Sequence, residues 1–550
     1  MTRTSTRRRL VRPRPAPAAA SRSAMMPTKA LGAISARVGG SAEIERVPAA
    51  YGDLRGWIAA LEAAGELRVI GAEVDWNVEL GTIMRLTQGA GTGPALLFNN
   101  IKDYNLPRSR CRRLFGGGLS GYRRIAMMLG LPPDTHPRAL VKVGRTILDG
   151  RIAPTVVKDG PVKEKVITGK DVDLFDLPAP QWNRPDGGRY LLTYGGVVTR
   201  DPDSGIMNVG IYRGMIARRD RLSVMMWRAQ HIGDHATAWQ RSGRSEMPIA
   251  IAIGWEPAFG LCAGSRIPKG VCEYDVMGAI RGQPVDLVRC ETVDLYVPAS
   301  AEIVIEGYLG FDPATYEMEG PFAEFTGYLS GERAPRPTIR VTAITHRHDP
   351  ILRGTIEGSM PGSYSENAVC SSILRAATAW NVLEQAGVPG VTDVWCPPVT
   401  AGIHLLIRMK PSYLGQAKQA ANAIWGSSAA HVRYKNVTVV DDDVDIHDYA
   451  AVDWAIAYRV NAGEDDIVVM PATYGAALDP STGSSGQSAD LFGTATWNRV
   501  LIDATRRRQC SRAAEGQGFP PNVWPSPHDL AGVRARWREL GFASPHAVGG

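Results

Sequence analysis

Between about residues 50 and 150, helical and strand-like patterns of apolar residues alternate along the chain. Asp53 can cap a helix that Gly65 ends. Its apolar residues recur on one helical face: Leu54, Trp57, Ile58 and Leu61. Runs at 67–70 and 95–98 have the length and composition of strands. The pattern predicts a small α/β domain.

The pattern changes between about residues 155 and 345. Apolar runs become short, and Gly, Pro and Asp separate them at irregular spacing. Only residues 231–242 keep a convincing helical period. This texture is typical of an antiparallel barrel or sandwich. The expected strands are 162–167, 191–199, 222–227, 249–253, 301–309 and 338–345.

Beyond about residue 350, helices and strands alternate again, which favours a parallel sheet. Helices are expected at 371–385, at 412–425 and after the capping residue Asp448, with strands at 391–396, 403–409 and 437–440. A last helix is predicted at 527–540, because Ser526-Pro527 can open it. We expect its apolar stripe to dock on another part of the chain or on a partner subunit.

The net charge of +7 comes from the N-terminus. Residues 1–42 carry nine of the 62 Lys and Arg and no Asp or Glu, which leaves 53 basic side chains against 55 acidic ones in the rest. The body is therefore near neutral and has no electrostatic footprint for nucleic acid. No run of about 18 apolar residues occurs, so no membrane span is expected.

Residues 1–45 are rich in Arg, Ala, Ser and Pro, a composition that cannot build a core and predicts disorder. The segment also fits an organellar transit peptide, and Met25-Met26 offers a later start. The seven cysteines are scattered, with no C-x-x-C pair, which indicates reduced thiols and a cytoplasmic protein.

Two motifs suggest ligand sites that their surroundings do not support. Residues 116–121 match G-x-G-x-x-G, but the acidic residue that would close a second strand is replaced by a loop at 131–134. A plain turn is favoured. The acidic run at 441–445 invites a metal site, yet it lacks the spacing and the Gly of an EF-hand. A strand-end loop is favoured there.

The segment Glu319-Gly-Pro-Phe-Ala-Glu324 places two carboxylates five residues apart. This spacing fits neither one helical turn nor one face of a strand, and Gly-Pro favours a turn. A turn can bring both carboxylates to one cavity, where such a pair can move protons near neutral pH. The alternative is a solvated loop.

Asn208, His231 and Glu273 offer an amide oxygen, an imidazole and a carboxylate. That set suits Mg²⁺ or Mn²⁺ helping to hold a phosphate. The alternative for His231 is a helix cap or a packing residue. His231 and His235 also have the spacing of an H-x-x-x-H zinc site, but no Glu follows His231.

These clusters belong to a set of motifs through which the chain resembles the UbiD family of prenylated-FMN-dependent (de)carboxylases, from about residue 50 to about 505. Each motif alone is weak, and their common order makes the resemblance specific. They are Met207–Arg213, Gln230-His231, Pro268–Glu273, Glu319–Glu324, Val440–Asp445 with Asp453-Trp454-Ala455, and Asp503-Ala504-Thr505.

The resemblance implies a multidomain fold of α+β and α/β parts. They are an N-terminal α/β region, a split β-barrel of the flavin-reductase type that binds the prenylated flavin, and a C-terminal α/β dimerisation domain, giving a homodimer or higher homo-oligomer. The expected segments are a disordered basic tail at 1–48, the N-terminal region at 49–154, the barrel at 155–347, the dimerisation domain at 348–505 and a tail at 506–550.

The resemblance also implies prenylated FMN (prFMN), supplied by a separate flavin prenyltransferase, and Mn²⁺, commonly with K⁺, at the cofactor phosphate. By motif position, Asn208, His231 and Glu273 are the metal ligands. The residues expected to contact the cofactor are Asn208, Ile211, Tyr212, Arg213, Met225, Met226, Trp227, Gln230, His231 and Glu273.

Arg213, Glu319 and Glu324 match the catalytic network of the family, with Glu324 as the proton donor. The implied reaction is reversible, non-oxidative decarboxylation of an aromatic, heteroaromatic or α,β-unsaturated carboxylic acid, with a ring carboxylate favoured. One alternative is a carboxylase or the catalytic subunit of a multi-subunit enzyme. Another is a flavin-binding protein without turnover, which would not need the complete network.

Three features leave alternatives open. Trp227 stands where some relatives carry a small aliphatic residue facing the substrate. The loop 358–367 either lines the pocket or caps the following helix. Lys418 and Lys435 are both candidates for the lysine that binds the cofactor phosphate.

Overall fold

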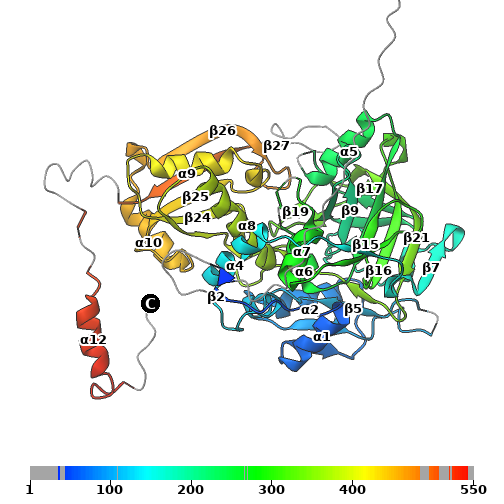
Figure 1. Ribbon diagram of the computed structural model, residues 1–550, viewed down its shortest axis with the longest axis horizontal. Coiled ribbons are helices and arrows are strands. Elements are labelled where there is room, and N and C mark those ends of the chain that lie inside the picture. Colours follow the sequence, from blue (N-terminus) through cyan, green and yellow to red (C-terminus); the bar gives the residue numbers. More distant parts are fainter. Residues whose placement is uncertain are drawn as a thin grey trace, which may run out of the picture.

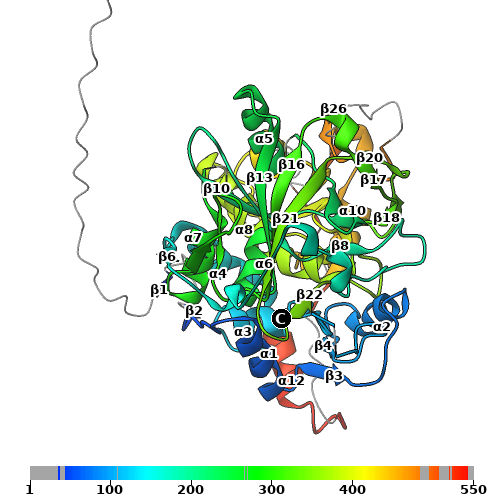
Figure 2. The same ribbon diagram turned by 90° about the vertical axis from the view of Figure 1, so that its right-hand side faces the viewer.

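The computed structural model describes residues 35–36, 44–107, 109–228, 230–265, 267–268, 270–482, 495–506, 519–520 and 523–542. The disorder expected for residues 1–48 falls almost wholly outside this range, as does Cys510. Within that tail, β1 (Ser35–Ala36) and β2 (Ile44–Glu45) form a short antiparallel pair. Figures 1 and 2 show the elements from α1 to β27 gathered around three sheets, and Figure 1 shows α12 standing apart from them.

The N-terminal part contains a four-stranded sheet in the order β22-β5-β4-β3. Its elements are α1 (Leu54–Ala63), β3 (Leu67–Ile70), α2 (Glu79–Gln88), β4 (Ala95–Phe98), β5 (Arg113–Gly116), α3 (Tyr122–Met128), α4 (Pro137–Asp149) and β22 (Ile351–Arg353). The Asp53 side chain accepts from the Gly56 N–H, which confirms the predicted cap. β22 pairs in parallel with β5, so the chain returns to this sheet after residue 347.

The central part is a nine-stranded sheet in the order β10-β9-β13-β16-β21-β12-β11-β8, with β7 beside β21, and it curls into a half-barrel (Figure 2). All its pairs are antiparallel, as the sequence pattern predicted. The strands are β7 (Lys165–Thr168), β8 (Tyr190–Leu192), β9 (Gly196–Arg200), β10 (Met207–Ile211), β11 (Gly214–Arg218), β12 (Arg221–Val224), β13 (Glu246–Ile253), β16 (Ile303–Gly310) and β21 (Thr338–His346).

Smaller pairings complete this part. The turn that carries Glu319 and Glu324 is framed by two short ribbons, β17 with β20 and β18 with β19. The strands outside the main sheet are β6 (Thr155–Val157), β14 (Asp286–Arg289), β15 (Tyr296–Pro298), β17 (Glu317–Glu319), β18 (Phe322–Ala323), β19 (Leu329–Ser330) and β20 (Ala334–Arg336).

Three helices interrupt the central part, where the sequence predicted only one. α5 (His231–Arg241) is the expected helix, and α6 (Pro257–Ala263) and α7 (Glu273–Arg281) are additional. Every residue of α6 and all but one of α7 are buried. A helix that is buried on all sides has no polar face, so the amphipathic period that would reveal it is missing.

The C-terminal part is a five-stranded sheet in the order β23-β24-β25-β27-β26. The expected parallel arrangement holds only for β24 with β25 and β25 with β27; both edge strands pair antiparallel, so the sheet is mixed. Its elements are α8 (Glu366–Gln385), β23 (Val391–Trp395), β24 (His404–Met409), α9 (Gln416–Trp425), β25 (Asn436–Asp441), α10 (Tyr449–Arg459), β26 (Ile467–Gly475) and β27 (Ala495–Ala504).

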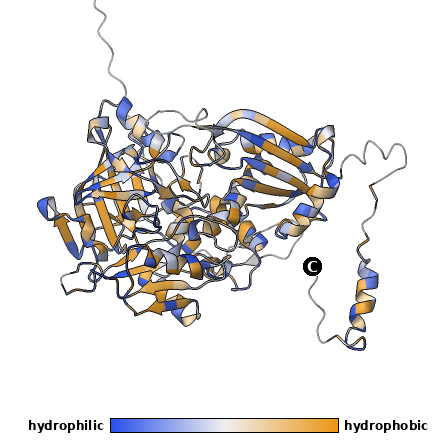
Figure 3. Cartoon of the chain, turned by 180° about the vertical axis from the view of Figure 1, so that it is seen from behind, coloured by the Kyte–Doolittle hydropathy of each residue, from blue (hydrophilic) through white to orange (hydrophobic). Residues whose placement is uncertain are grey.

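Helix α8 joins the parts of the molecule. It begins at Glu366, five residues before the predicted start, because Ser365 caps it by accepting from the Ala368 N–H. It packs against α4, α6 and β23. Apolar residues follow the strands of the sheets in Figure 3, and the largest core cluster runs through α8 from the N-terminal part to the C-terminal sheet.

Both ambiguous motifs of the sequence are structural. The Gly116–Gly121 loop donates the N–H groups of Gly117 and Leu119 to the Glu366 carboxylate, so a side chain of this protein fills the anion-binding loop. In the acidic run, Asp441 and Asp443 pair with Arg459 and Arg506. The run is a network of ion pairs at the end of β25.

The C-terminal helix is shorter than predicted. α12 spans Pro527–Ala535, and none of its residues is buried. None of the helices in the described part of the chain has the length and apolar character of a membrane span. The six cysteines in that part are free thiols.

Candidate active site

The turn predicted around Gly320-Pro321 brings two carboxylates to one arginine. Arg213 follows β10, and its guanidinium lies between Glu319 at the end of β17 and Glu324 just beyond β18. Arg213 Nη2 lies 2.9 Å from Glu319 Oε2, and Nη1 forms an ion pair with Glu324. All three side chains are almost fully buried. The alternative of a solvated loop is therefore wrong.

The two carboxylates have different surroundings. The Tyr190 hydroxyl donates to Glu319 Oε1 at 2.8 Å, so Glu319 receives hydrogen bonds on both oxygens. Among the described residues, Glu324 Oε2 receives the Phe325 N–H alone, at 3.3 Å. Burial lowers the pKa of Arg213, but the carboxylates of Glu324 and Glu319 outweigh it and raise that pKa above its usual value. Glu319 is thus the fixed partner of the arginine.

Asn208, His231 and Glu273 converge beside this network. Asn208 lies on β10, and His231 and Glu273 begin α5 and α7. His231 Nδ1 lies 3.0 Å from Asn208 Oδ1 and 4.0 Å from Glu273 Oε1. Burial raises the pKa of Glu273 to about 8, although the Val209 N–H donates to its carboxylate. A cation at this point would favour the ionised carboxylate.

Other metal arrangements find no support in the described residues. The second histidine of the H-x-x-x-H pair, His235, bonds the Thr199 hydroxyl through Nδ1 at 2.8 Å. The part of the chain that the structure describes contains no cluster of three His, Cys, Asp or Glu side chains suited to a metal. The set described above has Asn208 as its third member, and the buried Nδ2 of Asn208 has no hydrogen-bond partner among the residues that the structure describes.

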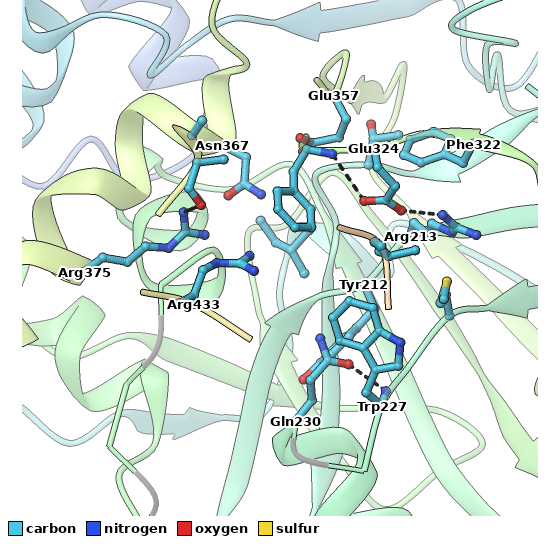
Figure 4. A pocket seen from close by; sticks show the side chains of 17 residues that line it. Tyr212, Arg213, Trp227, Gln230, Phe322, Glu324, Glu357, Asn367, Arg375 and Arg433 are labelled. Carbon is cyan, nitrogen blue, oxygen red and sulfur yellow. Dashed lines mark hydrogen bonds and ion pairs between the residues drawn. The ribbon is translucent and has the colours of Figure 1, made fainter. Parts of the chain in front are cut away.

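A cavity adjoins both clusters, between the half-barrel and the C-terminal part (Figure 4). Its apolar wall comes from Ile211, Met225, Phe322, Phe325 and Leu478, and its polar lining includes Glu324, Gln230 and Trp227. A second hollow shares six residues with the first and contains the Asn208, His231 and Glu273 set. The residues common to both are Ile211, Tyr212, Gln230, Asn367, Arg375 and Arg433.

The structure places most of the predicted cofactor contacts at these hollows. The exception is Met226, which is buried in the core of the half-barrel. Its two neighbours, Met225 and Trp227, lie with it just beyond the end of β12 and do line the cavity. The backbone N–H of Trp227 donates to Gln230 Oε1 at 2.8 Å, which fixes the Gln230 side chain just before α5.

Four lining residues with charged or amide side chains were missed or only hinted at by the sequence: Glu357, Asn367, Arg375 and Arg433. The predicted pocket loop 358–367 includes Asn367 and begins one residue after Glu357. Arg375 lies in the middle of α8, where its buried guanidinium donates to the carbonyls of Ala401 and Gly264. The sequence around these arginines carries no local signal of a site.

The two candidate lysines do not line the hollows. Lys435 Nζ is 2.7 Å from Asp479, and Lys418 Nζ is 3.9 Å from Asp465. The cationic groups that do line both hollows are Arg375 and Arg433.

Comparison with known proteins agrees with this geometry. Three domain models of 3-octaprenyl-4-hydroxybenzoate carboxy-lyase (UbiD) match the chain: the N-terminal domain at 58–143, the Rift-related domain at 155–360 and the C-terminal domain at 368–504. Pyrrole-2-carboxylic acid decarboxylase of Pseudomonas aeruginosa is 33% identical over 456 residues, covering 79% of this chain and 90% of that protein.

Two solved structures are similar over most of the chain. The UbiD-class enzyme HmfF of Pelotomaculum thermopropionicum, solved with FMN, has a TM-score of 0.71 and 32% identity over 87% of this chain and 99% of that one. An evolved dimeric form of HmfF has been solved with prFMN. Vanillic acid decarboxylase of Sedimentibacter hydroxybenzoicus has a TM-score of 0.77 and 29% identity, over 89% of this chain and 99% of that one. This chain therefore belongs to the UbiD family and is a carboxy-lyase.

Proposed function

We propose that this protein removes CO₂ reversibly and without oxidation from an aromatic or heteroaromatic carboxylic acid, using prFMN, with Glu324 as the proton donor. The observation that carries the proposal is the Arg213 guanidinium held between Glu319 and Glu324 at the wall of a largely apolar cavity. Relatives named as decarboxylases of pyrrole-2-carboxylic and vanillic acids support the substrate class.

The residues at the two hollows fit a flavin with a phosphate. Ile211, Tyr212, Met225, Trp227 and Gln230 offer apolar and hydrogen-bonding contacts for a ring system. Loss of CO₂ from an sp² carbon leaves negative charge that side chains cannot stabilise, and the prenylated flavin would supply the electron sink for it. We assign the cofactor phosphate to Arg375 and Arg433, whose guanidinium groups suit phosphate better than the distant lysines.

We assign Mn²⁺ to Asn208, His231 and Glu273, with K⁺ as a second cation near the phosphate. Two features support a cation here: no Lys or Arg among the described residues forms an ion pair with the buried carboxylate of Glu273, and an imidazole and an amide oxygen lie beside it. Oxygen donors with one nitrogen suit Mn²⁺. The metal would neutralise the phosphate and tie β10, α5 and α7 together.

In this assignment Glu319 and Tyr190 orient Arg213, and Arg213 positions Glu324 and attracts the substrate carboxylate. The protonated carboxyl of Glu324 gives its proton to the carbon that loses CO₂. Phe322 and Phe325 exclude water from that carbon, which strengthens the electrostatic interactions in the cavity. In the reverse direction Glu324 takes the proton back.

The organisation of the assembly is part of the proposal. We assign residues 49–154 to an N-terminal region, 155–347 to a split β-barrel of the flavin-reductase type and 348–505 to a dimerisation domain. A separate flavin prenyltransferase supplies the cofactor, and the enzyme works in the cytoplasm as a homodimer or higher homo-oligomer. An evolved dimeric form of the relative HmfF supports this kind of assembly.

Co-expression with a flavin prenyltransferase tests the proposal. The purified protein should carry modified flavin in its absorbance spectrum and release CO₂ from at least one acid in a screen of benzoic, hydroxybenzoic, pyrrole, furan, indole and cinnamic types. Protein purified without modified flavin would contradict the proposal. Flavin without CO₂ release from any acid would favour the non-catalytic alternative, and bicarbonate fixation would favour a carboxylase.

A further inference from the structure

One buried carboxyl group in the cavity has no place in the proposed chemistry. Glu357 lies on the loop between β22 and α8, where it lines the same cavity as Glu324 (Figure 4). The guanidinium of Arg85 on α2 donates to the backbone carbonyls of Glu357 and Gly358. An N-terminal helix therefore fixes the point at which this side chain enters the cavity.

The side chain of Glu357 is unusually placed for an acidic residue. It is 7% exposed, and its Oε2 has no hydrogen-bond partner among the described residues. Burial, together with the charge of Glu324, raises the pKa of Glu357 to about 7, against the opposing effects of Ser365, Asn367 and Arg375. Buried polar atoms are normally satisfied, so an unpaired oxygen at a cavity wall points to a ligand.

Glu357 does not stand alone. Asn367 Oδ1 and the indole Nε1 of Trp227 are also buried with no hydrogen-bond partner in the described part of the chain, and both residues line this cavity. The cavity thus presents two unpaired acceptor oxygens and one unpaired donor among apolar side chains. A purely hydrocarbon ring would leave all three unsatisfied, whereas a ring with its own N–H or O–H would satisfy an acceptor.

We propose that Glu357 determines substrate specificity by accepting a hydrogen bond from an N–H or O–H group on the ring of the acid. The preferred substrates are then donor-bearing ring acids of the pyrrole, indole or hydroxybenzoic type, in preference to furan, benzoic or cinnamic acids. This inference rests on the decarboxylase function proposed above and narrows its substrate class.

Matched substrate pairs test the inference: pyrrole-2-carboxylate with furan-2-carboxylate, and 4-hydroxybenzoate with benzoate. The wild-type holoenzyme should favour the donor-bearing member of at least one pair in kcat/KM. Glu357→Leu should lower kcat/KM for the donor-bearing acid about 10- to 100-fold, because that acid loses its hydrogen-bond acceptor. The kcat/KM of the analogue without a donor should stay within a few-fold, because that analogue makes no such bond in the wild type. Glu357→Gln keeps an acceptor oxygen and should restore most of the preference.

Leu478→Ala is the control, because it enlarges the same cavity without changing a polar group. Its effect should follow ring size and not the presence of a donor. An unchanged preference in Glu357→Leu would overturn the inference. An equal loss of kcat/KM on both members of a pair would also overturn it and would indicate that Glu357 takes part in proton transfer with every substrate. If Glu357→Leu lowers flavin absorbance and leaves the substrate preference unchanged, the Glu357 carboxylate accepts a hydrogen bond from the cofactor and not from the substrate.

A binding measurement separates this inference from the proposed function. Calorimetric titration of the flavin-loaded protein with pyrrole-2-carboxylate and with furan-2-carboxylate needs no turnover. The Kd ratio should favour the pyrrole in wild-type protein and approach one in Glu357→Leu. Selective binding without CO₂ release would contradict the decarboxylase proposal and support the acceptor role of Glu357. CO₂ release without selective binding would support the decarboxylase proposal and contradict the acceptor role.

Discussion

The Tyr190 hydroxyl lies 2.8 Å from Glu319 Oε1, on the side of that carboxylate opposite the Arg213 guanidinium. This contact makes the two glutamates of the network unequal. Each oxygen of Glu319 accepts a hydrogen bond, one from a charged and one from a neutral donor, whereas among the described residues Glu324 Oε2 has one long backbone contact. On this difference we base the proposed roles of Glu319 as anchor and Glu324 as proton donor, and it yields the first two predictions.

Glu324→Gln should lower decarboxylation at least 10³-fold, because an amide cannot deliver the proton. Flavin occupancy, measured by absorbance, should stay at the wild-type level. Solvent deuterium incorporation into the product carbon, followed by NMR, should disappear with the activity. Deuterium incorporation at the wild-type rate would remove Glu324 from the donor role.

Tyr190→Phe should lower kcat about tenfold with little change in KM, because Arg213 loses part of its orientation when Glu319 is freed on one side. The matched control is Tyr51→Phe, which removes a hydroxyl that donates to the Met127 carbonyl at 2.8 Å, away from the cavity. Steady-state kinetics and thermal unfolding of both variants distinguish the outcomes. Equal losses of stability with no difference in kcat would contradict the positioning role of Tyr190.

Asn208→Ala should lower bound metal and bound flavin together, because we propose that the cation at Asn208 also holds the cofactor phosphate. Metal analysis of the purified protein and its flavin absorbance provide the two readouts, and dialysis against a chelator should have the same effect on the wild type. Asn422→Ala on the exposed side of α9 is the control. Full flavin occupancy in a metal-free Asn208 variant would refute the shared site.

Glu357 should make the stability of the flavin-free protein pH-dependent. The pKa of its carboxyl is raised from 4.5 to about 7 in the folded state, so the folded state binds more protons than the unfolded state within that window. The Glu357 carboxyl therefore contributes to the free energy of unfolding below about pH 4.5, and this contribution is lost as the pH rises through about 7. Glu324 and Arg375 face the same carboxyl and shape this window.

The variant Glu357→Gln cannot titrate at this position. Its stability relative to wild type should therefore grow by roughly 3 kcal/mol between pH 4.5 and pH 7. Urea unfolding at several pH values measures the difference. Glu384→Gln on α8, at an exposed ion pair, should run parallel to wild type. Parallel curves for Glu357→Gln would show that the buried carboxyl does not titrate in this range.

The glycine-rich loop gives a prediction about stability alone. Glu366 is fully buried and accepts from Gly117, Leu119 and Arg353. Glu366→Gln should cost about 3 to 5 kcal/mol of unfolding free energy, because it leaves a buried arginine without its charge partner. Glu384 lies on the same helix as Glu366 and pairs with Arg145 of α4 at the surface, so Glu384→Gln should cost less than about 1 kcal/mol. Similar values for the two variants would contradict the burial argument.

The sequence by itself determined the local elements and the family. The cap at Asp53, the strands 67–70 and 95–98 and the helix from His231 follow from side chains close together in the chain. Periodicity and capping are local effects, so they can be recognised without the fold. The ordered motifs likewise identified the Arg213, Glu319 and Glu324 network before its geometry was known.

The tertiary structure decided what depends on distant contacts. Glu366 fills a loop 249 residues away, and Glu357 enters the cavity because Arg85 holds its backbone. The helices α6 and α7 are buried on nearly all sides, so their sequences lack the polar face by which a helix can be recognised. Burial, pairing of charges and the lining of a cavity arise only when segments far apart in sequence meet. Those properties therefore came from the fold and not from local pattern.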